Sequence, residues 1–146
     1  MKLQNQPAHD SEQTDIPTSQ KKDKVARKTP QSFPIVGIGA SAGGLEALEL
    51  FLANVPNNSG TAFVIVQHLD PTRKDIMVEL LQSGTSMSVV QIKDRMAIEP
   101  DHVYVIPPNK DVSILRGVLH LLAPVTPRDL RLPIDFFFRS LADDLQ

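Results

Sequence analysis

Hydrophobic positions change their spacing within residues 33–51, which read FPIVGIGASAGGLEALELF. The apolar run at 35–38 is short and continuous, as in a buried strand. After a cluster of small residues, apolar side chains return at helical spacing, at Leu45, Leu48, Leu52 and Val55. This pattern predicts a strand, a tight turn and a helix, with Ser41 on the turn.

Ser41 is surrounded by four glycines, at positions 37, 39, 43 and 44. Glycine permits close approach of two backbone segments and unusual φ values, and we expect both in a sharp strand-to-helix turn. The first N–H groups of the helix have no partner within the helix and form its positive dipole end. A nucleophile, an oxyanion or a phosphate would therefore be stabilised beside Ser41.

The turn fits known motifs to different degrees. Residues 39–43 (GASAG) match G-x-S-x-G, the nucleophile elbow that exposes a serine at the end of a strand. The glycines at 37, 39 and 43 resemble the dinucleotide fingerprint G-x-G-x-x-G, but the third comes one residue late. No Lys-Ser or Lys-Thr follows Gly44, which excludes a Walker A phosphate loop. A glycine turn whose serine caps the helix is the purely structural alternative.

The remaining pattern predicts strands and helices in alternation. Residues 62–66 form a continuous apolar run, typical of a parallel strand that is covered on both faces. A helix at about 73–82 follows, and this rhythm favours βαβ units with a parallel sheet. Later patterns predict strands at 88–92 and 102–106, a hairpin of 112–115 with 118–122, and a helix from Pro133. The apolar face of that last helix comprises Ile134, Phe137, Phe138, Leu141 and Leu145.

Residues 1–32 differ in composition from the rest of the chain. They contain no aromatic residue, many polar side chains and three prolines, at positions 7, 17 and 30. Such a segment buries too little apolar surface to offset the entropy of ordering it. We therefore expect a disordered polar tail over residues 1–32 and one globular domain over residues 33–146.

Composition narrows the chemistry of this domain. A hydrophobic content of 41% is typical of a globular protein, and a net charge of −2 does not indicate nucleic-acid binding. The absence of cysteine excludes thiol catalysis, disulfides and thiolate metal sites, and no histidine spacing indicates another metal site. No apolar run is long enough to span a membrane and no signal peptide is evident, so we expect a cytoplasmic protein.

A histidine follows the second predicted strand as Ser41 follows the first. Neighbouring parallel strands lie about 4.8 Å apart and end at the same edge of the sheet, where open α/β sheets bind ligands. We therefore expect Ser41 and His68 side by side, with the neutral imidazole taking the serine proton. Gln67 and His68 stand where a dinucleotide fold would place an acid, and an α/β-hydrolase places its histidine last. A histidine hydrogen-bonded at a strand end is the alternative, and structural roles are expected for His102 and His120.

Four segments together resemble the CheB-type protein-glutamate methylesterase family of bacterial chemotaxis. They read GIGASAGGLEAL, VIVQHLDP, HVYVIPPNK and the PID that precedes the last helix, in matching order and spacing from about Phe33 onward. The resemblance implies a doubly wound, mostly parallel α/β sheet with an inserted antiparallel hairpin. It also implies a cofactor-independent Ser-His-Asp hydrolase that cleaves glutamate methyl esters, and deamidates glutamines, on the cytoplasmic domains of methylated chemoreceptors. Ser41 matches the family's nucleophile and His68 matches its base.

Three features depart from the family pattern. Ala42 replaces a residue that is commonly threonine, although its backbone N–H and that of Gly43 still suit an oxyanion. Residues 1–32 are too short and too polar to be the family's usual receiver domain, and in this the chain resembles the form of the family that is fused to a receptor methyltransferase. Methyltransferase and kinase modules of two-component signalling are therefore expected partners. The G-M-G-x-D-G segment that carries the family's aspartate does not occur before Gln146. None of the aspartates at 70, 75, 129 and 135 matches that position.

These departures lead us to expect the first part of a larger catalytic domain. Such a chain would have little activity of its own, and its last apolar stripe, including Phe137, Phe138 and Leu141, would be partly exposed. Arg128 and Arg131 are candidates for contacting an acidic receptor surface, with solvated loop arginines as the alternative. Two further functions stay open: a catalytically inactive sensory or binding module of the same fold, and a nucleotide-binding α/β domain.

Overall fold

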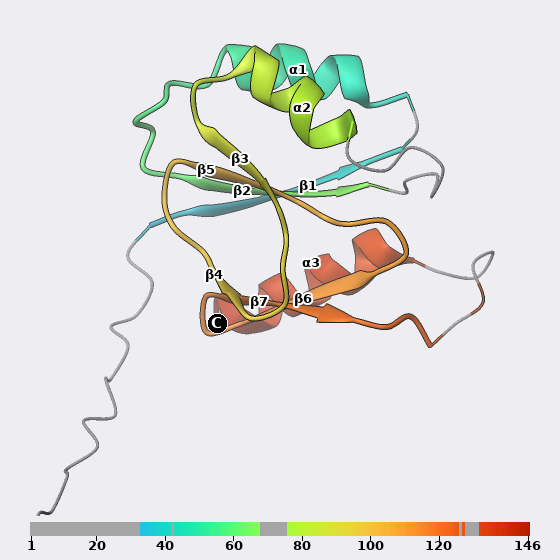
Figure 1. The fold of residues 1–146 in the computed structure, drawn as a ribbon. Helices are drawn as coiled ribbons and strands as arrows, with labels where there is room; N and C mark the ends of the chain where they lie inside the picture. Colours follow the sequence, from blue (N-terminus) through green and yellow to red (C-terminus); the bar gives the residue numbers. More distant parts are fainter. Residues whose placement is uncertain (1–32, 42, 68–75, 126, 128–131) are drawn as a thin grey trace, which may run out of the picture.

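A computed structural model describes residues 33–41, 43–67, 76–125, 127 and 132–146. Figure 1 shows a parallel sheet with helices on one face and a helix and a second sheet on the other. The parallel sheet has four strands in the order β1 (Ile35–Ala40), β2 (Ala62–Gln67), β5 (His102–Val105), β3 (Ser88–Gln91). The second sheet is antiparallel, in the order β4 (Met96–Ala97), β7 (Val118–Leu122), β6 (Asp111–Leu115).

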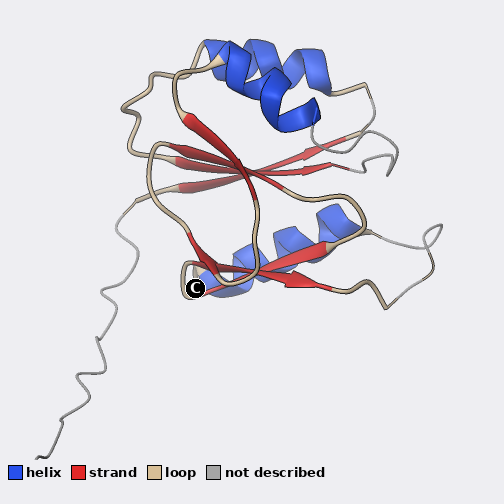
Figure 2. Cartoon of the chain, viewed as in Figure 1, coloured by secondary structure: helices blue, strands red, loops and turns tan. Residues whose placement is uncertain are grey.

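The helices divide between the two faces of the parallel sheet. Helices α1 (Leu45–Ala53) and α2 (Ile76–Gly84) cover one face, and α3 (Pro133–Asp144) lies with the antiparallel sheet on the other (Figures 1 and 2). Alternate residues of β2 enter two separate hydrophobic clusters, one for each face. This arrangement confirms the predicted doubly wound, mostly parallel sheet with an antiparallel insertion.

Strand β2 is the centre of the parallel sheet. All six of its residues are buried, as its continuous apolar sequence predicts. It pairs in parallel with β1 over its whole length, from Ile35 opposite Ala62 to Ala40 opposite Gln67. On its other side it pairs with β5, and β3 pairs only with β5 among the described strands. The predicted unit of β1, α1 and β2 is thus confirmed, and the position of β3 at the edge is new.

The glycines of β1 serve close packing rather than an unusual backbone. A Cβ atom at Gly37 would lie 3.0 Å from Phe137, and one at Gly39 would lie 2.6 Å from Ile134, so only glycine lets α3 approach this near. Among the described glycines, positive φ values occur at positions 60 and 117 alone. The unusual φ values expected for the glycines around Ser41 were therefore a wrong prediction, because none of the glycines at 37, 39, 43 and 44 has a positive φ.

Helix α3 begins at Pro133 as predicted and is hydrogen-bonded to the C-terminal end of β6. Phe137 and Leu141 are buried between α3 and the sheets, which contradicts their expected exposure, whereas Phe138 is 39% exposed. The Ser140 hydroxyl accepts a hydrogen bond from Ile114 N at 2.8 Å and donates one to Ile114 O at 3.0 Å. The predicted exposure of Phe137 and Leu141 was wrong because α3 packs against β1 and β6 of this same chain.

The hairpin of β6 and β7 turns at Arg116 and Gly117, as the sequence predicts. Both residues have positive φ, 51° and 69°, which is the geometry that a two-residue hairpin turn requires. Their N–H groups donate to the Asp144 carboxylate at the end of α3. Strand β4, too short for a sequence pattern, adds a third strand by pairing with β7.

Candidate active site

Ser41 directly follows β1 and is exposed at the C-terminal edge of the parallel sheet. Its carbonyl oxygen accepts a hydrogen bond from Gly44 N at 2.9 Å, which closes a tight turn into α1. The predicted strand, turn and helix are thus confirmed. An exposed serine between a strand end and a helix start is accessible to a substrate from the ligand-binding edge of the sheet.

The start of α1 is capped by backbone alone. Gly44 is the N-cap residue, and no side chain of the described residues makes a capping hydrogen bond there, so the structure does not show the alternative in which serine caps the helix. A Cβ at Gly44 would lie 2.9 Å from Cβ of Ala40 and 3.2 Å from Ser41 O, which explains the need for glycine. A Cβ at Gly43 would meet no heavy atom of the described chain within 4 Å. The side of the turn at Gly43 is therefore open.

Gln67 joins the ends of β1 and β2. Its side chain is the buried polar group of the described core, and residue 67 is 6% exposed. Its Nε2 donates to Ser41 O at 3.0 Å, while its Oε1 is buried without a hydrogen-bond partner in the described part of the chain. The sequence analysis noted Gln67 only because a dinucleotide-binding fold would have an acidic residue at this position. The signal available was an amide that ends an otherwise apolar strand.

Several predicted site residues lie outside the described residues. These are His68, Ala42, Arg128 and Arg131, together with the predicted start of the second helix at about residue 73. The structure does show that Ala40 and Gln67, which immediately precede Ser41 and His68, are register partners on neighbouring parallel strands. Contact between the Ser41 and His68 side chains stays a prediction.

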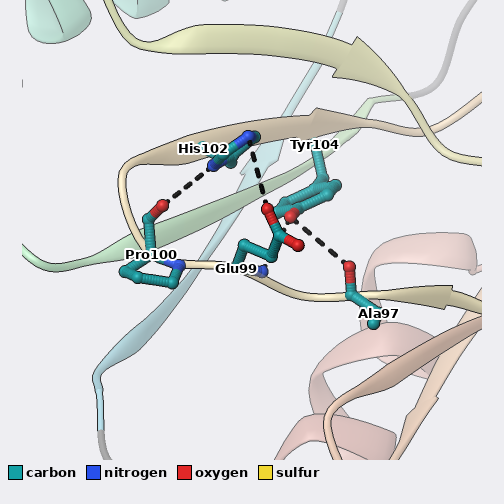
Figure 3. A network of polar contacts seen from close by, with 5 residues as sticks. All are labelled: Ala97, Glu99, Pro100, His102 and Tyr104. Carbon is teal, nitrogen blue, oxygen red and sulfur yellow. Dashed lines mark hydrogen bonds and ion pairs between the residues drawn. The ribbon is translucent and has the colours of Figure 1, made fainter.

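A second polar cluster lies at the opposite edge of the parallel sheet, where β5 begins (Figure 3). The ring of His102 stacks on that of Tyr104, and His102 Nδ1 lies 2.8 Å from Pro100 O. Tyr104 accepts a hydrogen bond from Glu99 N at 2.8 Å. Burial, and to a lesser extent the Glu99 carboxylate, raises the pKa of Tyr104 against the lowering effect of that N–H. These contacts tie a loop to a strand, in agreement with the structural role expected for His102.

The described residues contain no group of three or more histidine, cysteine or acidic side chains arranged to hold a metal ion. No helix among them is both long enough and apolar enough to cross a bilayer.

Comparison with known proteins identifies the family. The family model described as CheB methylesterase matches residues 36–146. A protein-glutamate methylesterase/protein-glutamine glutaminase of Desulfotalea psychrophila is 32% identical over an alignment of 115 residues, and the alignment covers 75% of this chain and 32% of the relative. A protein of the same description from Xanthomonas oryzae is 35% identical over 112 residues, 74% of this chain and 31% of the relative. The chain thus spans about a third of the length of these curated relatives.

A solved structure shares the fold. The catalytic domain of the Thermotoga maritima CheB methylesterase superposes with a TM-score of 0.67 at 26% sequence identity, covering 77% of this chain and 62% of that domain. The region matched by the family model begins within β1 and therefore includes the end of this strand and the turn that carries Ser41. With 111 of its 146 residues inside the family model, the chain belongs to the CheB methylesterase family.

Proposed function

We propose that this chain carries the nucleophile of a protein-glutamate methylesterase. The observation that carries the proposal is the register of β1 and β2, which pairs Ala40 with Gln67 directly before Ser41 and His68. Membership of the CheB methylesterase family and the exposed position of Ser41 between β1 and α1 support it.

In the proposed reaction, Ser41 Oγ attacks the carbonyl carbon of a glutamate γ-methyl ester while His68 accepts its proton. The N–H groups of Ala42 and Gly43, which follow Ser41 in the sequence, donate to the oxyanion of the tetrahedral intermediate. His68 then returns the proton to the leaving oxygen, so that methanol departs and an acyl-serine remains. Water then attacks the acyl carbon while His68 takes its proton, and His68 passes this proton to the departing Ser41 Oγ, which releases glutamate and free Ser41. With a glutamine substrate the same steps release ammonia instead of methanol.

The substrate class follows from the family, so it is part of the proposal. We propose that methylated cytoplasmic domains of chemoreceptors are the substrates and that Arg128 and Arg131 contact their acidic surface. The protein would then act in the cytoplasm, without a cofactor, beside methyltransferase and kinase modules of two-component signalling. The nucleotide-binding alternative is not favoured, because the matched relatives are described as esterases and glutaminases.

The proposed turnover of the 146-residue chain is low. None of its aspartates matches the position of the family's aspartate, and loss of a triad aspartate lowers kcat by about 10⁴. Two described aspartates are already committed elsewhere: Asp101 accepts from Gly60 N at 2.7 Å, and Asp144 holds the hairpin turn. Asp135 is exposed in the first turn of α3, which packs against Gly39 beside the serine turn. It is the described candidate for replacing that aspartate.

Covalent labelling with a fluorophosphonate tests the nucleophile, and methanol release from methylated receptor tests the reaction. We expect labelling that is abolished by Ser41→Ala and strongly reduced by His68→Gln. Ser88→Ala is a matched control, because Ser88 is also exposed but lies at the start of β3, at the opposite edge of the sheet. Labelling at a serine other than Ser41 would contradict the proposed nucleophile. Receptor binding without labelling or methanol release would favour the inactive binding module.

A further inference from the structure

The buried amide of Gln67 calls for an explanation that packing does not provide. Its Oε1 is buried and has no hydrogen-bond partner in the part of the chain that the structure describes, which is unfavourable for an acceptor. The residue ends an apolar strand in which every side chain is buried, so an aliphatic side chain would suit the position. Packing alone therefore does not explain an amide at this position, and the hydrogen bond that the Gln67 side chain donates is the remaining explanation.

That contact is with the backbone of the proposed nucleophile. Ser41 O accepts two hydrogen bonds, from Gln67 Nε2 at 3.0 Å and from Gly44 N at 2.9 Å. The two donors use both acceptor positions of the carbonyl oxygen and fix its direction. The amide orientation is set by the same contact, because the reversed amide would bring two carbonyl oxygens together.

We propose that Gln67 is a positioning residue for the nucleophile turn, acting through the Ser41 carbonyl. The carbonyl and N–H of a planar trans peptide point in opposite directions. A side chain that holds the Ser41 carbonyl inward therefore also directs the N–H that follows it, the proposed oxyanion donor. Gln67 does not contact the reacting atoms; it fixes the peptide that joins the nucleophile to that donor. The effect of Gln67 on the reaction at Ser41 rests on the proposed function. Its ordering of the turn rests on the observed hydrogen bonds alone.

Two substitutions remove the hydrogen bond while keeping an apolar side chain of similar volume. Gln67→Met preserves the unbranched shape, and Gln67→Leu is the second variant in case one side chain packs poorly. Because each also removes the buried Oε1, which has no hydrogen-bond partner among the described residues, we expect the melting temperature to change by less than about 4 °C or to rise. The N–H of Gly44 should exchange with solvent faster, because its acceptor is no longer held in place.

The Gln67 substitutions should lower the rate of reaction at Ser41 much more than they lower the stability of the fold. We expect the maximal rate of fluorophosphonate labelling at Ser41 to fall by up to about 100-fold, as misplacement of a reacting group by about 1 Å can do, with half-saturation little changed. Val103→Ala is the control. Val103 is fully buried in the same sheet, opposite Phe63 at the far end of β2, and its truncation should lower the melting temperature without a selective effect on Gly44.

The outcomes separate this proposal from the proposed function. Wild-type labelling at Ser41 with unchanged maximal rates in both Gln67 variants would overturn the positioning role and leave the function intact. Absence of wild-type labelling would overturn the function, and exchange at Gly44 would then decide whether Gln67 orders the turn. Parallel losses of stability and labelling in the Gln67 variants and in Val103→Ala would mean that Gln67 is a core residue only.

Discussion

Gly39 is the residue at which α3 comes nearest to β1. A Cβ atom there would lie 2.6 Å from Cγ2 of Ile134, well inside van der Waals contact. We expect Gly39→Ala to lower the free energy of unfolding by about 1–3 kcal/mol, because an added methyl group overpacks a filled site. Urea denaturation with unchanged slope measures the loss.

Gly43→Ala is the matched control for this substitution. No described heavy atom lies within 4 Å of its added Cβ, so the free energy of unfolding should change by no more than about 0.5 kcal/mol. Combining Gly39→Ala with Ile134→Ala should recover part of the loss, which a double-mutant cycle measures. Equal losses at both glycines would show that the backbone, rather than contact with α3, requires glycine.

Tyr104 is the single tyrosine of the chain and is 2% exposed, so tyrosinate absorbance reports on this residue alone. Burial raises its pKa in the folded state. The folded protein therefore holds the phenol proton more tightly than the unfolded chain, whose tyrosine titrates near pH 10. The resulting stability is fully present below about pH 10 and is lost as the pH rises through the folded-state pKa. We expect stability to fall over that range, and ionisation of the folded protein at or below the ordinary value would contradict this.

Tyr104→Phe provides the comparison for this titration. The substitution removes the acceptor of the Glu99 N–H, so we expect the free energy of unfolding at neutral pH to fall by about 1–2 kcal/mol. Above pH 10 the variant should lose stability less steeply than the wild type, because it has no phenol to ionise. Denaturation at a series of pH values measures both effects.

At the scale of elements, Ser140 fastens α3 to β6. Its hydroxyl satisfies both the N–H and the carbonyl of Ile114, which is buried. We expect Ser140→Ala to lower the free energy of unfolding by about 1–3 kcal/mol, because two backbone groups lose their partner. Hydrogen exchange at Ile114 should accelerate together with exchange in α3.

Ser83→Ala is the matched control for the helix–strand contact. Ser83 also lies in a helix, but it is exposed and its hydroxyl donates to Leu80 O of the same helix. Its substitution should change the free energy of unfolding by less than about 0.5 kcal/mol. A comparable loss at both serines would attribute the effect to helix propensity instead of to docking on β6.

At the scale of the whole molecule, apolar surface remains beside the edge of the parallel sheet. Strand β1 pairs with β2 alone among the described strands, and Phe138, 39% exposed, lies against Gly37 of β1. Open strand edges beside apolar side chains promote association. We expect the 146-residue chain to self-associate with increasing concentration and Phe138→Gln to weaken this in sedimentation velocity.

Leu50→Gln distinguishes a specific surface from general hydrophobicity. Leu50 is more exposed than Phe138, at 67%, but it lies on α1, on the other side of the parallel sheet. We expect its substitution to have a smaller effect on association. An equal or larger effect would show that the edge at β1 is not the associating surface.

Local sequence patterns were sufficient to predict the local elements and the place of Ser41. Periodicity of apolar residues predicted β1, α1, β2 and the start of α3, and Arg116-Gly117 predicted the hairpin of β6 and β7. These features depend on residues a few positions apart, which is the range over which side-chain spacing and turn geometry act. Four segments in matching order and spacing were enough to indicate the family that the family model then identified.

The contacts between these elements could not be predicted from local patterns and became known from the fold. The fold placed β5 between β2 and β3, buried Phe137 and Leu141 against β1 and β6, and showed that the glycines of β1 make room for α3. It also brought the Gln67 amide to the Ser41 carbonyl, 26 residues apart in the chain. Parallel pairing and helix packing join distant segments, so the same local pattern is compatible with several arrangements. The arrangement that buries the core side chains of all these elements together is the one that forms.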